Sequence, residues 1–105
     1  MFETTINKDM DLLLETLREM DRQIQLFGVQ SHPSGTGYAF SDSALLFARD
    51  NFAKCQKNGL LTWHEIMEEE IHEAYVETDP SRLREELIQV AAVALSWVRD
   101  IDGRR

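Results

Sequence analysis

Two glutamate-rich stretches, one on each side of Pro80, contain the residues of this 105-residue chain whose type and spacing could do chemistry. Side chains three residues apart on a helix lie on one face and can share one ion. Glu70 and Glu73 have that spacing, and so do Glu86 and Gln89. Oxygen ligands of this kind are those that Mg²⁺ prefers, with positions left over for substrate phosphates. The pattern therefore predicts a metal centre that handles phosphates.

The helical periodicity places several of these glutamates where apolar side chains are expected. At about 100° per residue, Glu70, Glu73 and Glu77 fall on the apolar side of a helix that starts near Trp63. On the next helix, Glu86 falls on the apolar arc of Leu83. The side chains expected to point away into solvent are Glu65, Glu68 and His72. Three acidic residues therefore interrupt the buried side of one helix, and one interrupts that of the next.

Carboxylates on the buried side of a helix require a stabilising partner, because burying an unpaired charge costs free energy. Like charges close together also raise one another's pKa values. A divalent cation would remove both penalties. The alternative is that each glutamate extends its carboxylate to water or pairs with an arginine. We favour the metal interpretation because Glu70, Glu73 and Glu86 share the problem.

Four helical segments are expected to position these side chains, which makes the fold class all-α. Apolar residues recur at spacings of three and four, Pro and Gly are scarce, and caps stand at the expected ends. Thr62 with Glu65 fits a capping box, and Asp79 can cap a helix that has Pro80 at its first position. The predicted helices are 7–27, 42–58 (starting at Ser41 or Asp42), 62–77 and 80–102.

The segment between the first two helices, 28–41, is rich in Gly, Ser, Pro and His. Its composition predicts a loop, and its length is unusual for a connection within a compact domain. We expect a functional loop. Its central part, His32–Gly37, could offer backbone N–H groups to a phosphate, or it could serve as a lid or as an interface arm.

Composition limits the class of protein. The length fits a single domain over 1–105, with 43% apolar and 29% charged residues. The net charge of −8 comes without a basic stripe, which argues against nucleic acid and against an anionic membrane surface as partners. The single cysteine, Cys55, cannot form an internal disulfide, which favours a reducing compartment. The first eleven residues lack the apolar core of a signal peptide, so we expect a cytoplasmic protein.

The acidic motifs resemble those of the MazG-like, all-α nucleoside triphosphate pyrophosphohydrolases. That family carries Glu-Glu-x-x-Glu on one helix and Glu-x-x-Asp on the next. Residues 69–73 match the first motif in full, and residues 86–89 match the second except at the last position, where Gln89 stands. The stretches 22–37, 61–63 and 86–93 look like the small branch of the family found in actinobacteria and their phages.

The resemblance implies a four-helix MazG-like bundle that hydrolyses a nucleoside or deoxynucleoside triphosphate to the monophosphate and pyrophosphate. It implies Mg²⁺ as cofactor, with Mn²⁺ as a substitute, held by Glu70, Glu73, Glu86 and Gln89. Glu69 would be a further ligand or the base that orients water. The amide oxygen of Gln89 can ligate Mg²⁺ but brings no charge, so we expect weaker metal binding, or fewer ions, than with aspartate at this position.

Basic and aromatic residues near the predicted loops are candidates for binding the substrate. Among the basic residues, which include Arg49, we favour Arg22 and Lys54 for the phosphates. Ordinary surface charge is the alternative for each. Trp63 could stack on the base, but an aromatic residue at helical spacing more often belongs to a core.

The last helix is apolar on two sides, since Ile88, Ala92 and Leu95 lie opposite the arc of Leu83. A helix that is apolar on both sides is buried on both sides. We therefore expect a homo-oligomer, either a dimer or a tetramer. Two other functions stay open at this point. One is a non-catalytic helical oligomer that binds nucleotide or a protein partner, and the other is a hydrolase of a different pyrophosphate, such as an alarmone.

Overall fold

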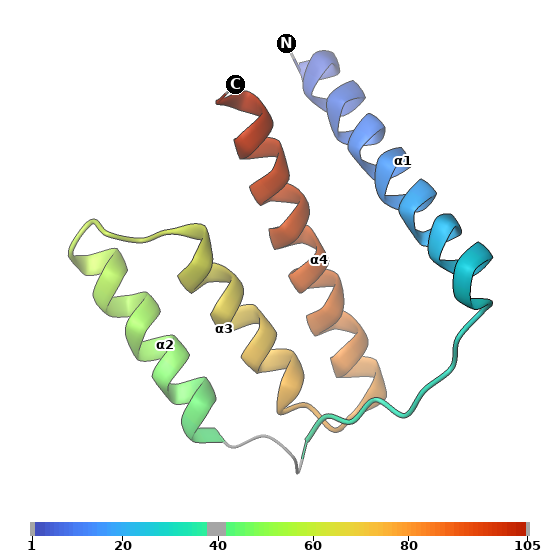
Figure 1. The fold of residues 1–105 in the computed structure, drawn as a ribbon. Helices are drawn as coiled ribbons and strands as arrows, with labels where there is room; N and C mark the ends of the chain where they lie inside the picture. The colour runs from blue at the N-terminus through green and yellow to red at the C-terminus, as the bar shows by residue number, and fades with distance from the viewer. Residues whose placement is uncertain (1, 38–41, 105) are drawn as a thin grey trace. The chain divides into compact units, whose positions relative to one another are not determined.

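The computed structural model describes residues 2–37 and 42–104. These residues form four helices joined by loops (Figure 1). The helices are α1 (Phe2–Phe27), α2 (Asp42–Lys57), α3 (Trp63–Tyr75) and α4 (Pro80–Gly103). No strand occurs in the described part of the chain, so the prediction of an all-α protein with four helices is confirmed. None of the described helices is long and apolar enough to cross a bilayer.

Two helix ends differ from the sequence prediction. Helix α1 begins at Phe2 rather than at Asn7, because the first residues contain neither Gly nor Pro and nothing interrupts the helix there. Helix α3 ends at Tyr75 rather than at Glu77, since the chain turns tightly and the Glu77 N–H donates to the Ala74 carbonyl oxygen at 3.2 Å. Ser41, one of the two predicted caps of α2, lies outside the described residues.

The chain divides into two compact units, Met1–Pro33 and Ser34–Arg105. The first contains α1, which ends where Gly28 adopts a φ of 74° and its N–H donates to the Ile24 carbonyl oxygen at 2.7 Å. Most of the large apolar side chains described on α1 are exposed, whereas Leu12 is half-buried. The exposed ones include Ile6, Met10, Leu13, Leu14, Leu17, Met20, Ile24, Leu26 and Phe27. The assignment of the whole chain to a single domain stays a prediction.

The second unit contains the other three helices, with α3 packed against both α2 and α4 (Figure 1). Its buried apolar residues are Leu45, Ala48, Ala74 and Leu83. At the start of α3, the Trp63 ring stacks on Trp97 of α4 with the ring centroids 6.4 Å apart. Because α3 is the middle helix, two of its faces are covered, which explains why so few of its side chains are exposed.

The covered face of α4 is turned from the arc expected from the sequence. Val90, Val93 and Trp97 are half-buried, whereas Leu87, which the periodicity placed beside Leu83, is exposed. The face that meets the rest of the unit is therefore centred closer to Glu86. This rotation carries the Glu86 carboxylate toward α3.

The loop before α2 is anchored on the turn between α3 and α4. The Thr36 hydroxyl donates to the Glu77 carbonyl oxygen at 2.7 Å, and the Gly37 N–H donates to the Tyr75 carbonyl oxygen at 2.7 Å. Gly37 is buried and has a φ of 90°, and a Cβ there would lie 2.5 Å from Cγ2 of Thr78. Glycine is therefore required both by the backbone conformation and by the close approach.

Candidate metal centre

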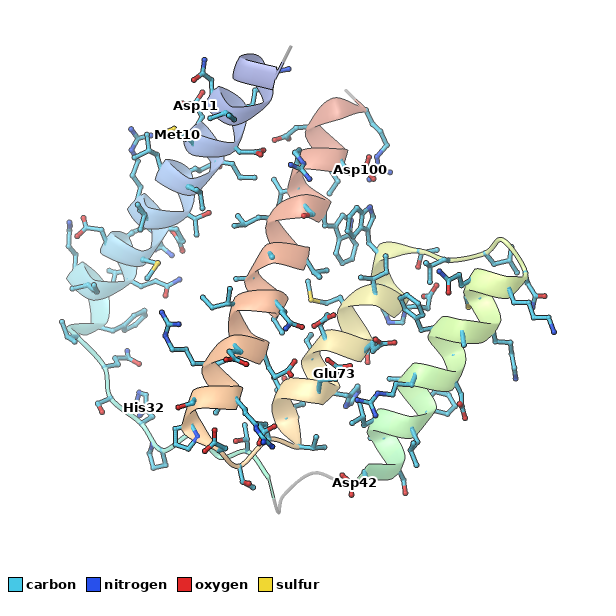
Figure 2. The ribbon with its side chains drawn as sticks, turned by 180° about the vertical axis from the view of Figure 1, so that it is seen from behind. Met10, Asp11, His32, Asp42, Glu73 and Asp100 are labelled. Carbon is cyan, nitrogen blue, oxygen red and sulfur yellow. The ribbon has the colours of Figure 1, made fainter. Side chains whose placement is uncertain are left out.

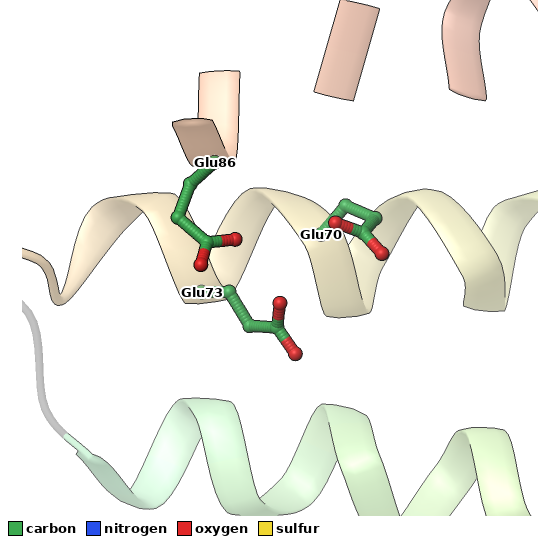
Figure 3. A group of neighbouring side chains, drawn as sticks. All are labelled: Glu70, Glu73 and Glu86. Atoms are coloured by element: carbon green, nitrogen blue, oxygen red, sulfur yellow. The ribbon is translucent and has the colours of Figure 1, made fainter. Parts of the chain in front are cut away.

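Three glutamates from two helices meet in the second unit. Glu70 and Glu73 lie one turn apart on α3, and Glu86 reaches them from α4 (Figure 3). One carboxylate oxygen from each can be chosen so that all three lie within 4.8 Å of one another. We call these residues the glutamate triad. Three of the four residues predicted to hold a metal thus lie close together, and their role as ligands stays a prediction.

The triad fits a hard divalent cation on two grounds. Its donors are carboxylate oxygens, which Mg²⁺ and Mn²⁺ prefer. In addition, Oε2 of Glu70 and Oε2 of Glu86 are buried and have no hydrogen-bond partner among the described residues. Buried polar atoms in folded proteins normally have a partner. A cation between the carboxylates would supply one for both oxygens.

Electrostatics within the triad oppose ionisation. Burial raises the pKa of Glu70, and the charges of Glu73 and then Glu69 raise it further. Burial also raises the pKa of Glu86, followed by the charge of Glu73 and a hydrogen bond with it. Without a cation, crowding of this kind favours a shared proton. A bound cation would reverse the preference and hold the carboxylates ionised.

An arginine from the neighbouring helix α2 borders the triad. Nη2 of Arg49 lies 3.5 Å from Oε1 of Glu73. The Arg49 side chain is 50% exposed, whereas that of Glu73 is 20% exposed. The guanidinium therefore reaches inward from solvent and balances part of the negative charge. Lys54, the basic residue of α2 that we favoured from the sequence, is exposed.

The other two residues of the expected centre, Glu69 and Gln89, do not belong to the triad. Burial raises the pKa of Glu69, as does the charge of Glu73, while Arg49 lowers it. The charges of Glu73 and Arg49 thus both act on Glu69, which is a carboxylate near the triad that can accept a proton. Gln89 stands one turn after Glu86 on α4 and is exposed. Whether Gln89 ligates a metal stays a prediction.

The prediction that Glu65 points into solvent is wrong. Glu65 is 8% exposed, because it folds back on the start of α3 and accepts hydrogen bonds from the Thr62 N–H at 3.0 Å and the Thr62 hydroxyl at 2.9 Å. These bonds and a contact with His64 lower its pKa. The predicted contact between Glu65 and the backbone of Thr62 is thus confirmed.

The prediction that His72 is exposed is also wrong. Its side chain is 24% exposed, with Nε2 lying 3.2 Å from Oε2 of Glu68 and the ring meeting Tyr75 edge-on. The reason is that α3 is covered on two faces, which a wheel drawn for one buried face does not anticipate. Glu68 remains partly exposed, with 43% of its side chain accessible.

The structure places the three substrate-binding candidates in different surroundings. Arg22 belongs to the first unit and pairs with Glu19 at 2.6 Å, a contact that lowers the pKa of that carboxyl to about 2. Trp63 stacks on Trp97, and its Nε1–H donates to Asp100 at 2.7 Å. One face of the indole is thus taken by a protein contact. Figure 2 draws the side chains of the described residues of both units as sticks.

Comparison of the chain with models of protein families, with curated proteins and with solved structures finds no match.

Sequence reasoning did not single out the pairing of Arg49 with Glu73, which are 24 residues apart. Local spacing carries no signal for such a contact, and Arg49 looks like any charged residue on an exposed helix face. A packing argument that set α2 against α3 could have found it. The same holds for Trp97, whose periodicity identified a core residue but not its partner.

Proposed function

We propose that this chain is a Mg²⁺-dependent pyrophosphohydrolase that converts a nucleoside or deoxynucleoside triphosphate to the monophosphate and pyrophosphate. The observation that carries the proposal is the glutamate triad, with two buried carboxylate oxygens that have no partner among the described residues. The proposal also rests on the resemblance of residues 69–73 and 86–89 to the MazG-like motifs. The combination favours a metal centre over a solvated acidic surface.

In the proposed mechanism, the carboxylates of Glu70, Glu73 and Glu86 would hold the divalent cation. The cation supplies charge neutralisation at the phosphates and activation of water. Glu69 takes the proton of the attacking water. Burial, the main cause of the raised pKa of Glu69, would make it a better base than an exposed glutamate. Gln89 would add a neutral oxygen ligand from α4.

We further propose that the active form is a homo-oligomer, a dimer or a tetramer built from MazG-like bundles. Large apolar side chains are exposed along α1, and Leu87, Ile88, Val98 and Ile101 are exposed on α4. Water-exposed apolar surface of this extent is typical of a protein interface rather than of a stable monomer surface. Burial against further copies of the chain would remove it from water.

A second candidate is a non-catalytic helical oligomer that binds a nucleotide or a protein partner. It is favoured by one observation, namely that Gln89 is neutral and exposed where the family has an aspartate. A chain with one carboxylate fewer would hold fewer ions or hold them more weakly. Hydrolysis of another pyrophosphate, such as an alarmone, is compatible with the same site and differs only in the substrate.

The experiment that tests the function is release of pyrophosphate from a panel of nucleoside and deoxynucleoside triphosphates, with Mg²⁺ or Mn²⁺. Glu70→Gln and Glu73→Gln should each lower turnover by about a hundredfold or more, because loss of an outer partner of a metal ligand already costs about 10–100-fold. Glu85→Gln, an exposed neighbour of Glu86, is the matched control. Nucleotide binding without turnover would favour the second candidate.

A further inference from the structure

Arg49 is a positively charged side chain from outside the glutamate triad that contacts one of its carboxylates. It comes from α2, whereas the triad comes from α3 and α4. Its guanidinium lies 3.5 Å from Oε1 of Glu73, and its charge is also felt by Glu69. Half of the side chain is exposed, so the group can move while its helix stays in place.

Arg49 and a divalent cation would compete for the same carboxylate. A cation bound to Glu73 would neutralise the negative charge that attracts the Arg49 guanidinium. The cation would also repel the guanidinium directly. The ion pair of Glu73 with Arg49 would then weaken, leaving an arginine beside a metal centre. A guanidinium has five N–H donors in a planar fork that matches the oxygens of a phosphate group.

We propose that Arg49 is the counter-ion of Glu73 in the metal-free chain and a phosphate-binding residue once the metal is bound. The inference rests on the proposed function and assigns Arg49, which lies 3.5 Å from Glu73, to the phosphates of its substrate. The ion pair with Glu73 would thereby keep the Arg49 guanidinium from binding phosphate until a metal has neutralised the glutamate triad.

The first arm of the test measures binding of Mn²⁺ alone by isothermal titration to the full chain and to Arg49→Gln. Because the variant removes a competing positive charge, it should bind Mn²⁺ about two- to fivefold more tightly, the worth of one partly exposed ion pair. A structural role, in which Arg49 only orients Glu73, predicts the opposite sign. Lys57→Gln removes the same charge from an exposed site on α2 and serves as control.

The second arm measures binding of inorganic tripolyphosphate at saturating Mn²⁺. Arg49→Gln should weaken it about tenfold or more, which is the range for a hydrogen bond between charged groups. Arg49→Lys, which keeps the charge but loses the fork, should recover part of the affinity. The Lys57→Gln control should match the unaltered chain in both arms.

Each outcome decides between the inference and the function. Weaker Mn²⁺ binding by Arg49→Gln, or unchanged tripolyphosphate binding, would overturn the role of Arg49 and leave the proposed function in place. If the unaltered chain binds no Mn²⁺, the proposed function fails and the inference fails with it. A far-ultraviolet circular dichroism spectrum equal to that of the unaltered chain shows that each variant has folded.

Discussion

The ring of Trp63 stacks on the ring of Trp97 with the two planes 13° apart, and its Nε1–H donates to Asp100 at 2.7 Å. These contacts join the first turn of α3 to the last part of α4. The turn between Tyr75 and Pro80 joins the same two helices at their other ends. The glutamate triad lies between the two connections, so the relative placement of its α3 and α4 carboxylates depends on both.

Replacing Trp63 should therefore weaken the second unit. We expect Trp63→Ala to lower the free energy of unfolding by about 2 kcal/mol, less than for a fully buried tryptophan because the residue is half-buried. Trp63→Phe keeps an aromatic ring and should cost about half as much. Urea titration followed by the fluorescence of Trp97 measures both. Equal stability of all three proteins would show that the stack does not hold the helices together.

Gly37 offers a test of the loop that is anchored on the α3–α4 turn. We expect Gly37→Ala to lower the free energy of unfolding by about 2 kcal/mol or more, since it adds strain at positive φ to a contact with Thr78. Gly35→Ala is the matched control, because φ is 70° there but nothing lies within 4 Å of an added Cβ. It should cost about 1 kcal/mol. If the two variants are equally stable in urea titration, the close approach to Thr78 is not present in solution.

The raised pKa values of Glu70 and Glu86 predict how the stability of the metal-free protein depends on pH. Their ordinary value is 4.5, and in the folded chain both lie above it. At a pH between the unfolded and the folded pKa of each group, the folded state binds more protons than the unfolded state. These groups therefore make the chain less stable as the pH rises through that range. Chemical denaturation from pH 4.5 to 7 in the presence of a chelator measures this contribution.

Glu86→Gln isolates that contribution. The variant should be more stable than the unaltered metal-free chain at pH 7, and the two should converge toward pH 4.5, where Glu86 is increasingly protonated. Glu85→Gln, which alters the neighbouring exposed carboxylate, should follow the unaltered chain. A loss of stability in Glu86→Gln at pH 7 would mean that the carboxylate is already balanced by a cation or a donor.

The proposed oligomer predicts the effect of charge on the exposed apolar surfaces. Leu17→Glu on α1 and Ile88→Glu on α4 should each reduce the mass measured by light scattering, because an unpaired charge would be buried in the interface. Arg18→Glu alters charge more strongly at a neighbouring exposed position and should leave the mass unchanged. A monomeric mass for the unaltered chain would contradict the oligomer.

Much of the fold could be predicted because its signals are local. The stop at Gly28, the cap at Asp79 and the contact from Glu65 to Thr62 each involve residues within four positions of one another. The burial of Glu65 and His72 could not be predicted in this way. It depends on α3 having a helix on either side, which is a property of the tertiary arrangement.

The candidate site shows the same division. Spacing and periodicity identified Glu70, Glu73 and Glu86, since each interrupts an apolar arc. The pairing of Arg49 with Glu73 needed the packing of α2 against α3, and no spacing along the chain encodes it. Helix periodicity therefore identifies carboxylates that need an explanation, while the neighbouring cation is visible only in three dimensions.

The most direct test of the metal centre is the affinity of the chain for Mn²⁺, measured by electron paramagnetic resonance with Mg²⁺ as competitor. We predict saturable binding that Mg²⁺ displaces, weakened at least about tenfold in Glu86→Gln and unchanged in Glu85→Gln. Taken with the greater stability expected for metal-free Glu86→Gln, one substitution would stabilise the metal-free chain and weaken its binding of metal. Equal Mn²⁺ affinity in the unaltered chain and in both variants would contradict a site at the glutamate triad.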